Sequence, residues 1–348
     1  DMSNLTDLLP AGAGGKQVNF VATGTIGNGV TVGLKTDGTV EAVAGVAGGG
    51  GTPTVFGASI ALSSVPSIVY DTLNDKVVIS YAENTSCYSV VGTVSGTSIS
   101  FGTPVSFGAN AFDGANAGIS SAFDSNSNKV VVTFKDSSNS NYVTIRVGTV
   151  SGTSISFGSA LHEYIPIDDD TATVFDSTNN KIVVFFRNTS TSTGGCQVGT
   201  VSGTSISLGA QQTFVAATAY PQYMSAVFDS DSGKTVTVYR AVASNNNYGT
   251  AFVGTVSGTS ISFGTSVVYE SSDSTYNTLA YDSTTGKVVI GFRANTYGNA
   301  IVGTVSGTSI SFGAKNVWHS ADTNEISLAY NIPKSKIVLS YRDSSNGY

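Results

Sequence analysis

Short apolar runs, separated by turns rich in glycine, asparagine and serine, recur along most of the chain. In the second recurring unit, we expect four strands at Ser120–Asp124, Lys129–Lys135, Val143–Val150 and Ser154–Leu161. The second of these strands carries three consecutive valines, so both of its faces need apolar cover. The fourth alternates hydroxyl and apolar residues, which is typical of a half-buried strand.

The string VGTVSGTSISFG marks successive units. It spans the end of the third strand, a tight Ser-Gly-Thr turn and the start of the fourth strand. Its copies are spaced by about 50 residues, which is the period of a propeller blade. The copies begin at Val91, Val147, Val253 and Val302, and one with leucine in place of the phenylalanine begins at Val198.

A second repeated element joins the first and second strands. An aspartate ends the first strand, and a lysine five residues later begins the second. We expect the carboxylate to cap the turn and the lysine to return across it as an ion pair worth ~0.2–1 kcal/mol. Such near-identical copies favour a scaffold role over a catalytic or metal-binding one. The pairs are Asp71/Lys76, Asp124/Lys129, Asp176/Lys181, Asp229/Lys234, Asp282/Lys287 and, in degenerate form, Asn331/Lys336.

These patterns predict an all-β protein, because no helical period of useful length appears. The expected architecture is a β-propeller of about six four-stranded blades over residues 53–348, with seven blades possible. A solenoid of the same units is the main alternative, but second strands with two apolar faces favour radial closure. Residues 1–52 are predicted to form a small N-terminal β arm or attachment module, with turns at Gly27–Gly29 and Thr36–Gly38 and a Gly48–Gly51 linker.

The sixth unit supplies only two strands, at Glu325–Tyr330 and Lys336–Arg342. Pro53–Leu62 resembles a fourth strand without its third, so the simplest closure places it on the last blade. The N-terminal segment could add the third strand. A longer natural chain, a seventh blade or a strand from a neighbouring chain are the alternatives.

The arginines occupy one position of the repeat. Four of the five lie at the end of a second strand, each after phenylalanine or tyrosine, and a lysine holds this position in the second unit. A ring of guanidinium groups beside aromatic rings could hold carboxylates, sulfates or sugar hydroxyls. In the alternative interpretation, each arginine packs over the preceding aromatic residue and forms a hydrogen bond or ion pair with a loop carbonyl or acid in its own blade. The residues are Lys135, Arg187, Arg240, Arg293 and Arg342.

The loops predicted between one blade's fourth strand and the next blade's first strand differ most between units. They hold the only tryptophan, both histidines and several tyrosines, which could contact a ligand or pack within the loop. Asp168–Asp170 could bind calcium, but an acidic run is usually only solvated, so no metal is predicted. The remaining ligand-binding candidates are His162, Tyr164, Tyr223, Trp318 and His319.

Composition narrows the function classes. Only 11% of the residues are charged and the net charge is −7, which argues against nucleic acid as a partner. No apolar run approaches the ~18 residues of a membrane helix, so no membrane insertion is predicted. Cys87 and Cys196 lie at non-equivalent repeat positions, so we expect no disulfide. No cofactor is implied.

Support for catalysis in the sequence is thin. It contains neither a nucleophile elbow nor a metalloprotease motif. Sialidases carry an arginine triad on a six-bladed propeller, but the equivalent placement of the arginines here resembles repeat inheritance. We therefore predict no catalytic residues and no enzyme activity, with a glycan hydrolase as the least favoured alternative.

The opening SNLTDLLPAGAGGKQVNFVATGTIGNGVTVGLKTDGTVEAVAG, together with FDSxxxKVVVxF and VGTVSGTSISFG, resembles the tail-fibre-like virion proteins of marine tailed bacteriophages. The resemblance implies a virion appendage whose propeller binds a host surface glycan or receptor and whose residues 1–52 attach to other virion proteins. A homo-oligomer is expected. The alternative to host binding is a purely structural decoration or filament subunit, assembled through the N-terminal arm and the incomplete last blade. The chain from Met2 shows no signal peptide, so we expect release by lysis to the virion surface.

Overall fold

The computed structural model describes residues 32–34, 40–42, 54–56, 66–109, 118–242, 246–332 and 335–345. The chain divides into two compact units, one of Asp1–Pro53 with Ser95–Ser98 and one of the remaining residues. In the first unit, β1 (Val32–Leu34) and β2 (Val40–Ala42) pair antiparallel on either side of the predicted Thr36–Gly38 turn. The predicted Gly27–Gly29 turn, glycine-rich linker and attachment role lie outside the described residues.

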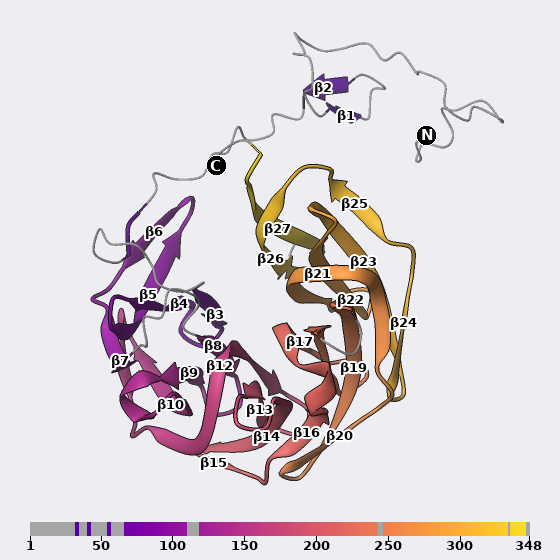
Figure 1. Cartoon of the computed structure of the whole chain (residues 1–348). Helices are drawn as coiled ribbons and strands as arrows, with labels where there is room; N and C mark the ends of the chain where they lie inside the picture. The colour runs from indigo at the N-terminus through magenta and orange to yellow at the C-terminus, as the bar shows by residue number, and fades with distance from the viewer. Residues whose placement is uncertain are drawn as a thin grey trace, which may run out of the picture. The chain divides into compact units, whose positions relative to one another are not determined.

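The second unit is a β-propeller, as predicted, and its blades follow one another in chain order (Figure 1). Blade 1 comprises β3 (Ser67–Asp71), β4 (Lys76–Glu83), β5 (Ser86–Ser95), β6 (Ser98–Phe101) and β7 (Val105–Ala109). Blade 2 comprises β8 (Ser120–Asp124), β9 (Lys129–Asp136), β10 (Tyr142–Ser151), β11 (Ser154–Phe157) and the start of β12 (Leu161–Asp176). Blade 3 continues with β13 (Lys181–Asn188), β14 (Thr193–Ser202), β15 (Ser205–Leu208) and β16 (Gln212–Val215).

Blade 4 comprises β17 (Pro221–Asp229), β18 (Lys234–Ala241), β19 (Tyr248–Ser257), β20 (Ser260–Phe263) and the start of β21 (Val267–Asp282). Blade 5 continues with β22 (Lys287–Ala294), β23 (Tyr297–Ser306), β24 (Ser309–Phe312) and β25 (Asn316–His319). Blade 6 holds β26 (Thr323–Asn331) and β27 (Lys336–Asp343). Two short 3-10 helices, Ser137–Asn139 and Ala217–Ala219, complete the described elements.

The fourth strand of each complete blade is split, which corrects the single strand predicted at Ser154–Leu161. β10 pairs first with β11, through Gly148 and Phe157, and then with the start of β12, through Thr144 and His162. The break falls at Gly158, where an added Cβ would lie only 2.0 Å from the backbone oxygen of Thr204 in the next blade. The predicted loop that contains His162 and Tyr164 is therefore strand, and β12 and β21 run unbroken into the next blade.

The second strands are buried on both faces, as predicted. Val130, Val131 and Val132 are all fully buried. Val130 and Val132 pack in a core cluster shared with blade 1, whereas Val131 packs in another shared with blade 3. Each such side chain contributes about 1.5–3 kcal/mol on burial, so the core is a series of layers between neighbouring blades.

The repeated aspartates cap the turns as predicted, but the lysines do not form ion pairs with them. Asp71 Oδ1 accepts the backbone N–H groups of Leu73 and Asn74, at 3.0 and 2.9 Å. Lys76 donates to backbone carbonyls of the turn, and Lys181 donates to Thr200 Oγ1 at 2.8 Å. The ion pair predicted within these two units is therefore wrong, because nearby uncharged acceptors satisfy the ammonium groups.

The first strand of each blade contacts the first strand of the next, so these strands line the inside of the arc. Ser67 Oγ lies 2.7 Å from Ser121 Oγ, and Thr173 N donates to Ser120 Oγ at 2.8 Å. Leu328 N donates to Thr278 Oγ1 at 3.3 Å in the same way between blades 5 and 6. The beginnings of successive first strands are thereby brought side by side.

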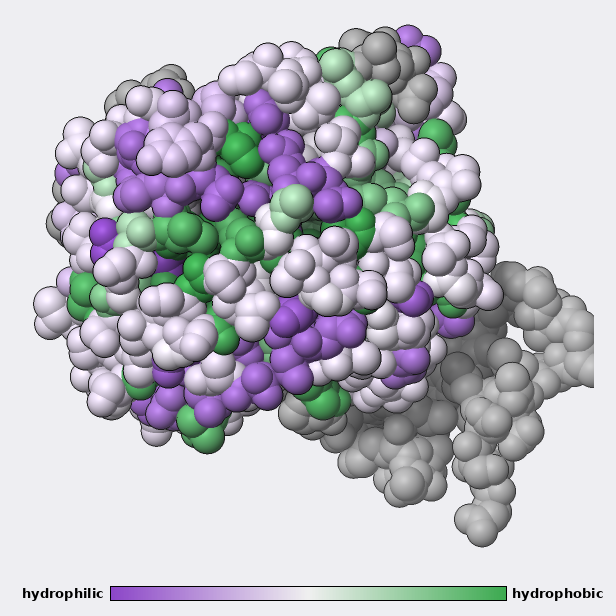
Figure 2. Space-filling model, turned by 90° about the horizontal axis from the view of Figure 1, so that it is seen from below, coloured by the Kyte–Doolittle hydropathy of each residue, from purple (hydrophilic) through white to green (hydrophobic). Residues whose placement is uncertain are grey.

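The surface shown in Figure 2 is mostly polar or weakly polar, with apolar residues in smaller groups, as the low charge content indicates. Cys87 and Cys196 are buried and free. No helix in the described part of the chain is long and apolar enough to cross a membrane.

Candidate functional site

A backbone bulge recurs near the beginning of the first strands. Tyr223, Tyr276 and Glu325 occupy equivalent positions, six residues before the turn position at the end of the strand, and all three have φ near 50°. The pairing of these strands with the second strands shifts register at the same place. A non-glycine residue in this region costs on the order of 1 kcal/mol, and such strain clusters at functional sites.

Contacts between neighbouring blades hold this bulge. The N–H of Tyr223 donates to Asp170 Oδ1 at 2.8 Å, and Asn277 Nδ2 donates to the carbonyl of Tyr223 at 3.3 Å. The rings of Tyr223 and Tyr276 lie 5.4 Å apart with an interplanar angle of 56°. Both tyrosines are half-buried, and burial raises the pKa of Tyr223 more than Arg240 lowers it. The Tyr223 hydroxyl is therefore a neutral donor at physiological pH.

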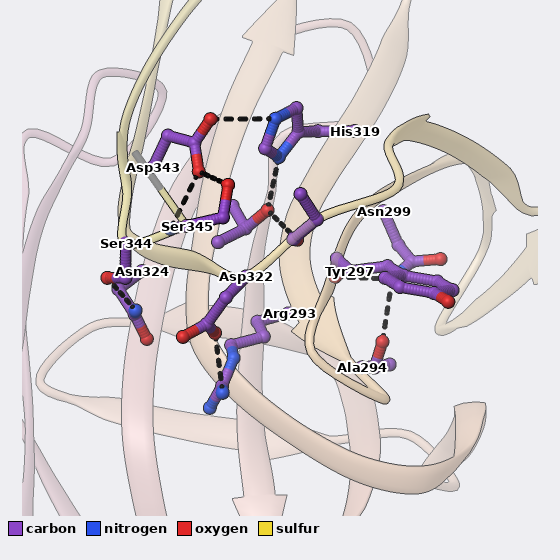
Figure 3. A network of polar contacts seen from close by, with 12 residues as sticks. Arg293, Ala294, Tyr297, Asn299, His319, Asp322, Asn324, Asp343, Ser344 and Ser345 are labelled. Carbon is purple, nitrogen blue, oxygen red and sulfur yellow. Dashed lines mark hydrogen bonds and ion pairs between the residues drawn. The ribbon is translucent and has the colours of Figure 1, made fainter. Parts of the chain in front are cut away.

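The arginines link second strands to the next blade. Arg240 Nη1 lies 3.0 Å from Asp273 Oδ1 on β21, where this strand passes from blade 4 into blade 5, while its Nη2 donates to Gln222 Oε1 on β17. Its guanidinium carbon also lies 4.9 Å from the centre of the Tyr223 ring. Arg293 Nη2 donates to Asp322 Oδ1 at 2.9 Å, which joins blade 5 to the chain entering blade 6 (Figure 3).

The first and last arginines of the series, Arg187 and Arg342, form ion pairs within their own blades. Arg187 forms an ion pair with Asp168 in its own blade, and its guanidinium carbon lies 3.4 Å from the centre of the Tyr220 ring of the next blade. Arg342 pairs with Glu325 in its own blade at 2.9 Å. We call this set the arginine–acid rim; it comprises Arg187, Arg240, Arg293, Arg342, Asp168, Asp170, Gln222, Tyr223, Asp273, Tyr276, Asp322 and Glu325.

The rim changes the prediction made for the arginines. They do pair with acids, but the acids of Arg240 and Arg293 lie on the segments that lead from their own blade into the next. Lys135, at the equivalent position of blade 2, is buried at 3% exposure. Strongly anionic ligands would have to displace the carboxylates, so of the ligands considered for the arginines this geometry favours sugar hydroxyls over carboxylates and sulfates.

The sequence contains a signal for the residues that contact the arginines and that were not predicted. Tyr220, Asp273 and Asp322 each lie nine residues before the turn position that ends the first strand. A fixed offset of this kind places them at equivalent points of consecutive blades. The signal is hard to see because the residue type at this offset changes from blade to blade.

Two of the other candidates contact blade 2. His162 Nδ1 lies 2.9 Å from Thr144 Oγ1, and the His162 ring is 3.8 Å from Asp136 Oδ2. Tyr164 is 85% exposed, and its ring contacts that of Tyr142 at 5.7 Å. Both predictions as ligand contacts stay untested.

Trp318 and His319 lie on β25 and contact blade 6. The Trp318 ring is 4.8 Å from the ring of Tyr341. His319 Nε2 lies 3.3 Å from Asp343 Oδ2, and its Nδ1 lies 2.8 Å from Thr323 Oγ1 (Figure 3). Because Thr323 is fully buried and also donates to the carbonyl of Ala321, it is placed to fix the strand rather than to attack a substrate.

The rim offers donors, acceptors and aromatic faces together. The Nε atoms of Arg240 and Arg293 are buried without a hydrogen-bond partner among the described residues. Asp273 and Glu325 are about half exposed, so their carboxylates can accept hydrogen bonds from solvent or a ligand. The described residues contain no group of three His, Cys, Asp or Glu side chains that could hold a metal ion. Asp170 instead accepts a backbone N–H group.

Comparisons with known proteins show the fold. No protein-family model and no curated protein match the chain. Among solved structures, it is similar to a putative 6-phosphogluconolactonase from Bacteroides fragilis (TM-score 0.57, 10% identity, 82% of this chain and 79% of that one). It is also similar to a putative 6-phosphogluconolactonase from Bacteroides uniformis (0.56, 12%, 80% and 78%) and to a protein from Lactobacillus plantarum (0.55, 12%, 82% and 86%).

These findings overturn two predictions. The chain was expected to be a non-enzymatic phage appendage, but similar propellers include putative enzymes, and the structures named above come from bacteria. Absence of catalytic sequence motifs does not exclude activity, because propellers assemble sites from residues dispersed over several blades. At such low identity the likeness establishes the fold alone. The resemblance to phage proteins, the localisation and the oligomeric state stay predictions.

Proposed function

We propose that the arginine–acid rim binds an uncharged sugar or sugar derivative, and that the protein is an enzyme acting on it. The observation that carries the proposal is the group formed by Tyr223, Tyr276 and Arg240. Two strained tyrosines in adjacent blades contact each other, and one of them, Tyr223, lies beside a guanidinium whose Nε has no partner among the described residues. Aromatic faces stack on sugar rings, and a planar guanidinium donates to hydroxyl or carbonyl oxygens.

Charge favours an uncharged ligand. Each rim arginine has a carboxylate partner, and Asp170 adds a further acid. These carboxylates accept hydrogen bonds from hydroxyl groups, whereas they repel phosphate and sulfate. The similar structures whose name denotes a phosphorylated sugar lactone as substrate support a sugar-type ligand, but the acids of this rim disfavour its phosphate.

The rim also contains groups suited to hydrolysis. Arg240 can polarise a carbonyl oxygen, and the half-exposed carboxylate of Asp273, 3.0 Å from Arg240, can accept a proton from an attacking water. Arg240 lies at the end of β18 and Asp273 lies within β21, and the sheet pairing of these strands keeps the separation of the two groups fixed. Hydrolysis of a sugar lactone or ester is therefore the reaction class that these groups support best.

The test combines binding and turnover. The full chain is titrated with neutral monosaccharides and their lactones by calorimetry, and lactone hydrolysis is followed by acid release. Tyr223→Ala and Arg240→Ala should each weaken binding about tenfold or more, whereas Tyr164→Ala and Arg146→Ala, which change an exposed tyrosine and an arginine outside the rim, should not. Binding unaffected by the rim variants, or equal loss in the controls, would reject the site. Binding without turnover would reject the enzymatic part alone.

A further inference from the structure

The groups around Tyr223 are repeated one blade further along. Tyr223 and Tyr276 each lie six residues before the turn position that ends their first strand, and each has φ near 50°. The residue before each tyrosine pairs across the sheet with a rim arginine, which is Arg240 in blade 4 and Arg293 in blade 5. Blades 4 and 5 therefore carry an aromatic ring and a guanidinium group at equivalent positions.

The two arginines also have acids at equivalent positions. Arg240 Nη1 lies 3.0 Å from Asp273 Oδ1, and Arg293 Nη2 lies 2.9 Å from Asp322 Oδ1. The side chains of Asp273 and Asp322 are 56% and 42% exposed, so both carboxylates can also accept hydrogen bonds from a ligand. A repeated set of aromatic face, cationic donor and anionic acceptor suits a ligand whose hydroxyl-bearing units also repeat.

The two tyrosine rings are in contact but face different directions. Their centres lie 5.4 Å apart, and their planes are inclined at 56°. A single sugar ring stacks on only one of two faces inclined in this way. The separation of the rings is close to the length of one sugar residue in a linear oligosaccharide. Neighbouring sugars of one chain can therefore reach both rings.

Acids occupy the equivalent positions on either side of the tyrosine pair. Asp170, in blade 3, accepts the N–H of Tyr223 through Oδ1 at 2.8 Å. Glu325, in blade 6, is about half exposed and pairs with Arg342 at 2.9 Å. Because neither acid has an aromatic ring, stacking along these four equivalent positions is limited to two sugars.

We propose that the rim binds an uncharged oligosaccharide through two neighbouring sugars, one stacked on Tyr223 and the other on Tyr276. This inference rests on the proposed function, because the first sugar occupies the Tyr223 site described above. Tyr276 provides the second stacking face and so determines the preferred ligand length. Arg240 and Arg293, with their acids, bond hydroxyl groups of successive sugars. The ligand class is a neutral glycan fragment of two or more units rather than a free monosaccharide.

The test titrates the full chain by calorimetry with glucose, cellobiose and cellotriose, and with the matching mannose and N-acetylglucosamine series. We expect one series in which the second sugar lowers Kd about tenfold or more and the third changes it less than about threefold. Tyr276→Asn removes the ring, and asparagine tolerates the left-handed backbone, so this variant should lose the gain from the second sugar. Tyr276→Phe keeps the ring and should keep the gain.

Monosaccharide binding separates this inference from the proposed function. Tyr223→Asn should weaken binding of one sugar and of two, whereas Tyr276→Asn should leave the affinity for one sugar nearly unchanged. A second sugar that adds no affinity, or a gain that survives Tyr276→Asn, would overturn the inference and leave the Tyr223 site standing. Equal loss for one and two sugars in Tyr276→Asn would also overturn it, because the ring would then only support Tyr223. Absence of binding in every series would reject both proposals.

Discussion

Arg293 Nη2 donates to Asp322 Oδ1 at 2.9 Å, and this contact connects the second strand of blade 5 with the chain that enters blade 6. Arg240 and Asp273 make the same connection one blade earlier, at 3.0 Å. The contact is therefore a repeated joint between blades as well as a candidate binding element. A ligand on the rim would touch groups that also set the spacing of neighbouring blades.

Burial predicts unequal stability effects around the rim. The side chain of Arg187 is 7% exposed, whereas those of Arg342 and Glu325 are about half exposed. Arg187→Ala should lower the free energy of unfolding by ~3 kcal/mol, because Asp168 loses a buried cation. Arg342→Ala should cost less than ~1 kcal/mol. Chemical denaturation of the two variants measures the difference, and equal losses would contradict the burial argument.

Substitution of glycine by alanine should change the stability of the chain in opposite directions at two positions. Gly264→Ala should destabilise the chain by about 2–3 kcal/mol or more, because its Cβ would meet the Thr308 carbonyl oxygen. Gly313→Ala has open space and should be neutral or stabilising by up to ~1 kcal/mol, since alanine reduces the freedom of the unfolded chain. Thermal unfolding compares them. Similar melting temperatures would show that blades 4 and 5 are less closely packed than described.

Glu270 predicts a pH-dependent contribution to stability. Burial raises its pKa, but hydrogen bonds from Lys315 and Ser272 lower the pKa by a larger amount. The pKa of Glu270 therefore lies below its ordinary value of 4.5. Because the folded pKa lies below the unfolded one, this carboxylate stabilises the chain above pH 4.5, and the contribution is lost as pH falls through the folded pKa.

Lys315→Met tests this linkage, because it removes the Nζ group that lies 2.6 Å from Glu270 Oε2. The pKa of Glu270 should rise, and destabilisation relative to the unchanged chain should be larger at pH 7 than at pH 3. Carboxyl NMR titration and unfolding at both pH values measure these effects. Lys336→Met, which changes an exposed lysine, is the control. A Glu270 pKa unchanged by Lys315→Met would refute the assignment.

The two thiols should be inert in the native chain. Burial raises the pKa of Cys87 and of Cys196 to about 12, and Asp136 adds to the effect at Cys87. Thiol reagents act on the thiolate, so labelling at pH 8 should be slow until the chain is unfolded. Mass spectrometry after timed labelling measures this. Rapid labelling of Cys196 under native conditions would show that the core between blades 3 and 4 opens.

Much of the scaffold could be predicted because it repeats. Val130 to Val132 indicated a strand between two apolar layers, and the Asp and Gly positions indicated the turns. The split of the fourth strand could not be foreseen, since it arises where Gly158 meets the backbone of the next blade. Apolar periodicity within one blade contains no information about that contact.

The rim was only half predictable for a similar reason. The arginines stood out because residue type and position both recur, whereas Asp273 and Asp322 share only a position with Tyr220. The left-handed bulge at Tyr223 depends on hydrogen bonds from two neighbouring blades, so its conformation is a property of the assembled blades. Predictions for His162 and Tyr164 treated them as loop residues, although they lie on a strand.

The most direct measurement follows the arginine side chains during ligand addition. Arginine Nε–Hε signals of the full chain are recorded by NMR while a neutral sugar or sugar lactone that binds in calorimetry is titrated. The account predicts that the signals of Arg240 and Arg293 shift as their guanidinium groups contact the ligand, while that of Arg146, on β10 outside the rim, stays in place. Saturable binding that leaves both rim signals unchanged would contradict the proposed site.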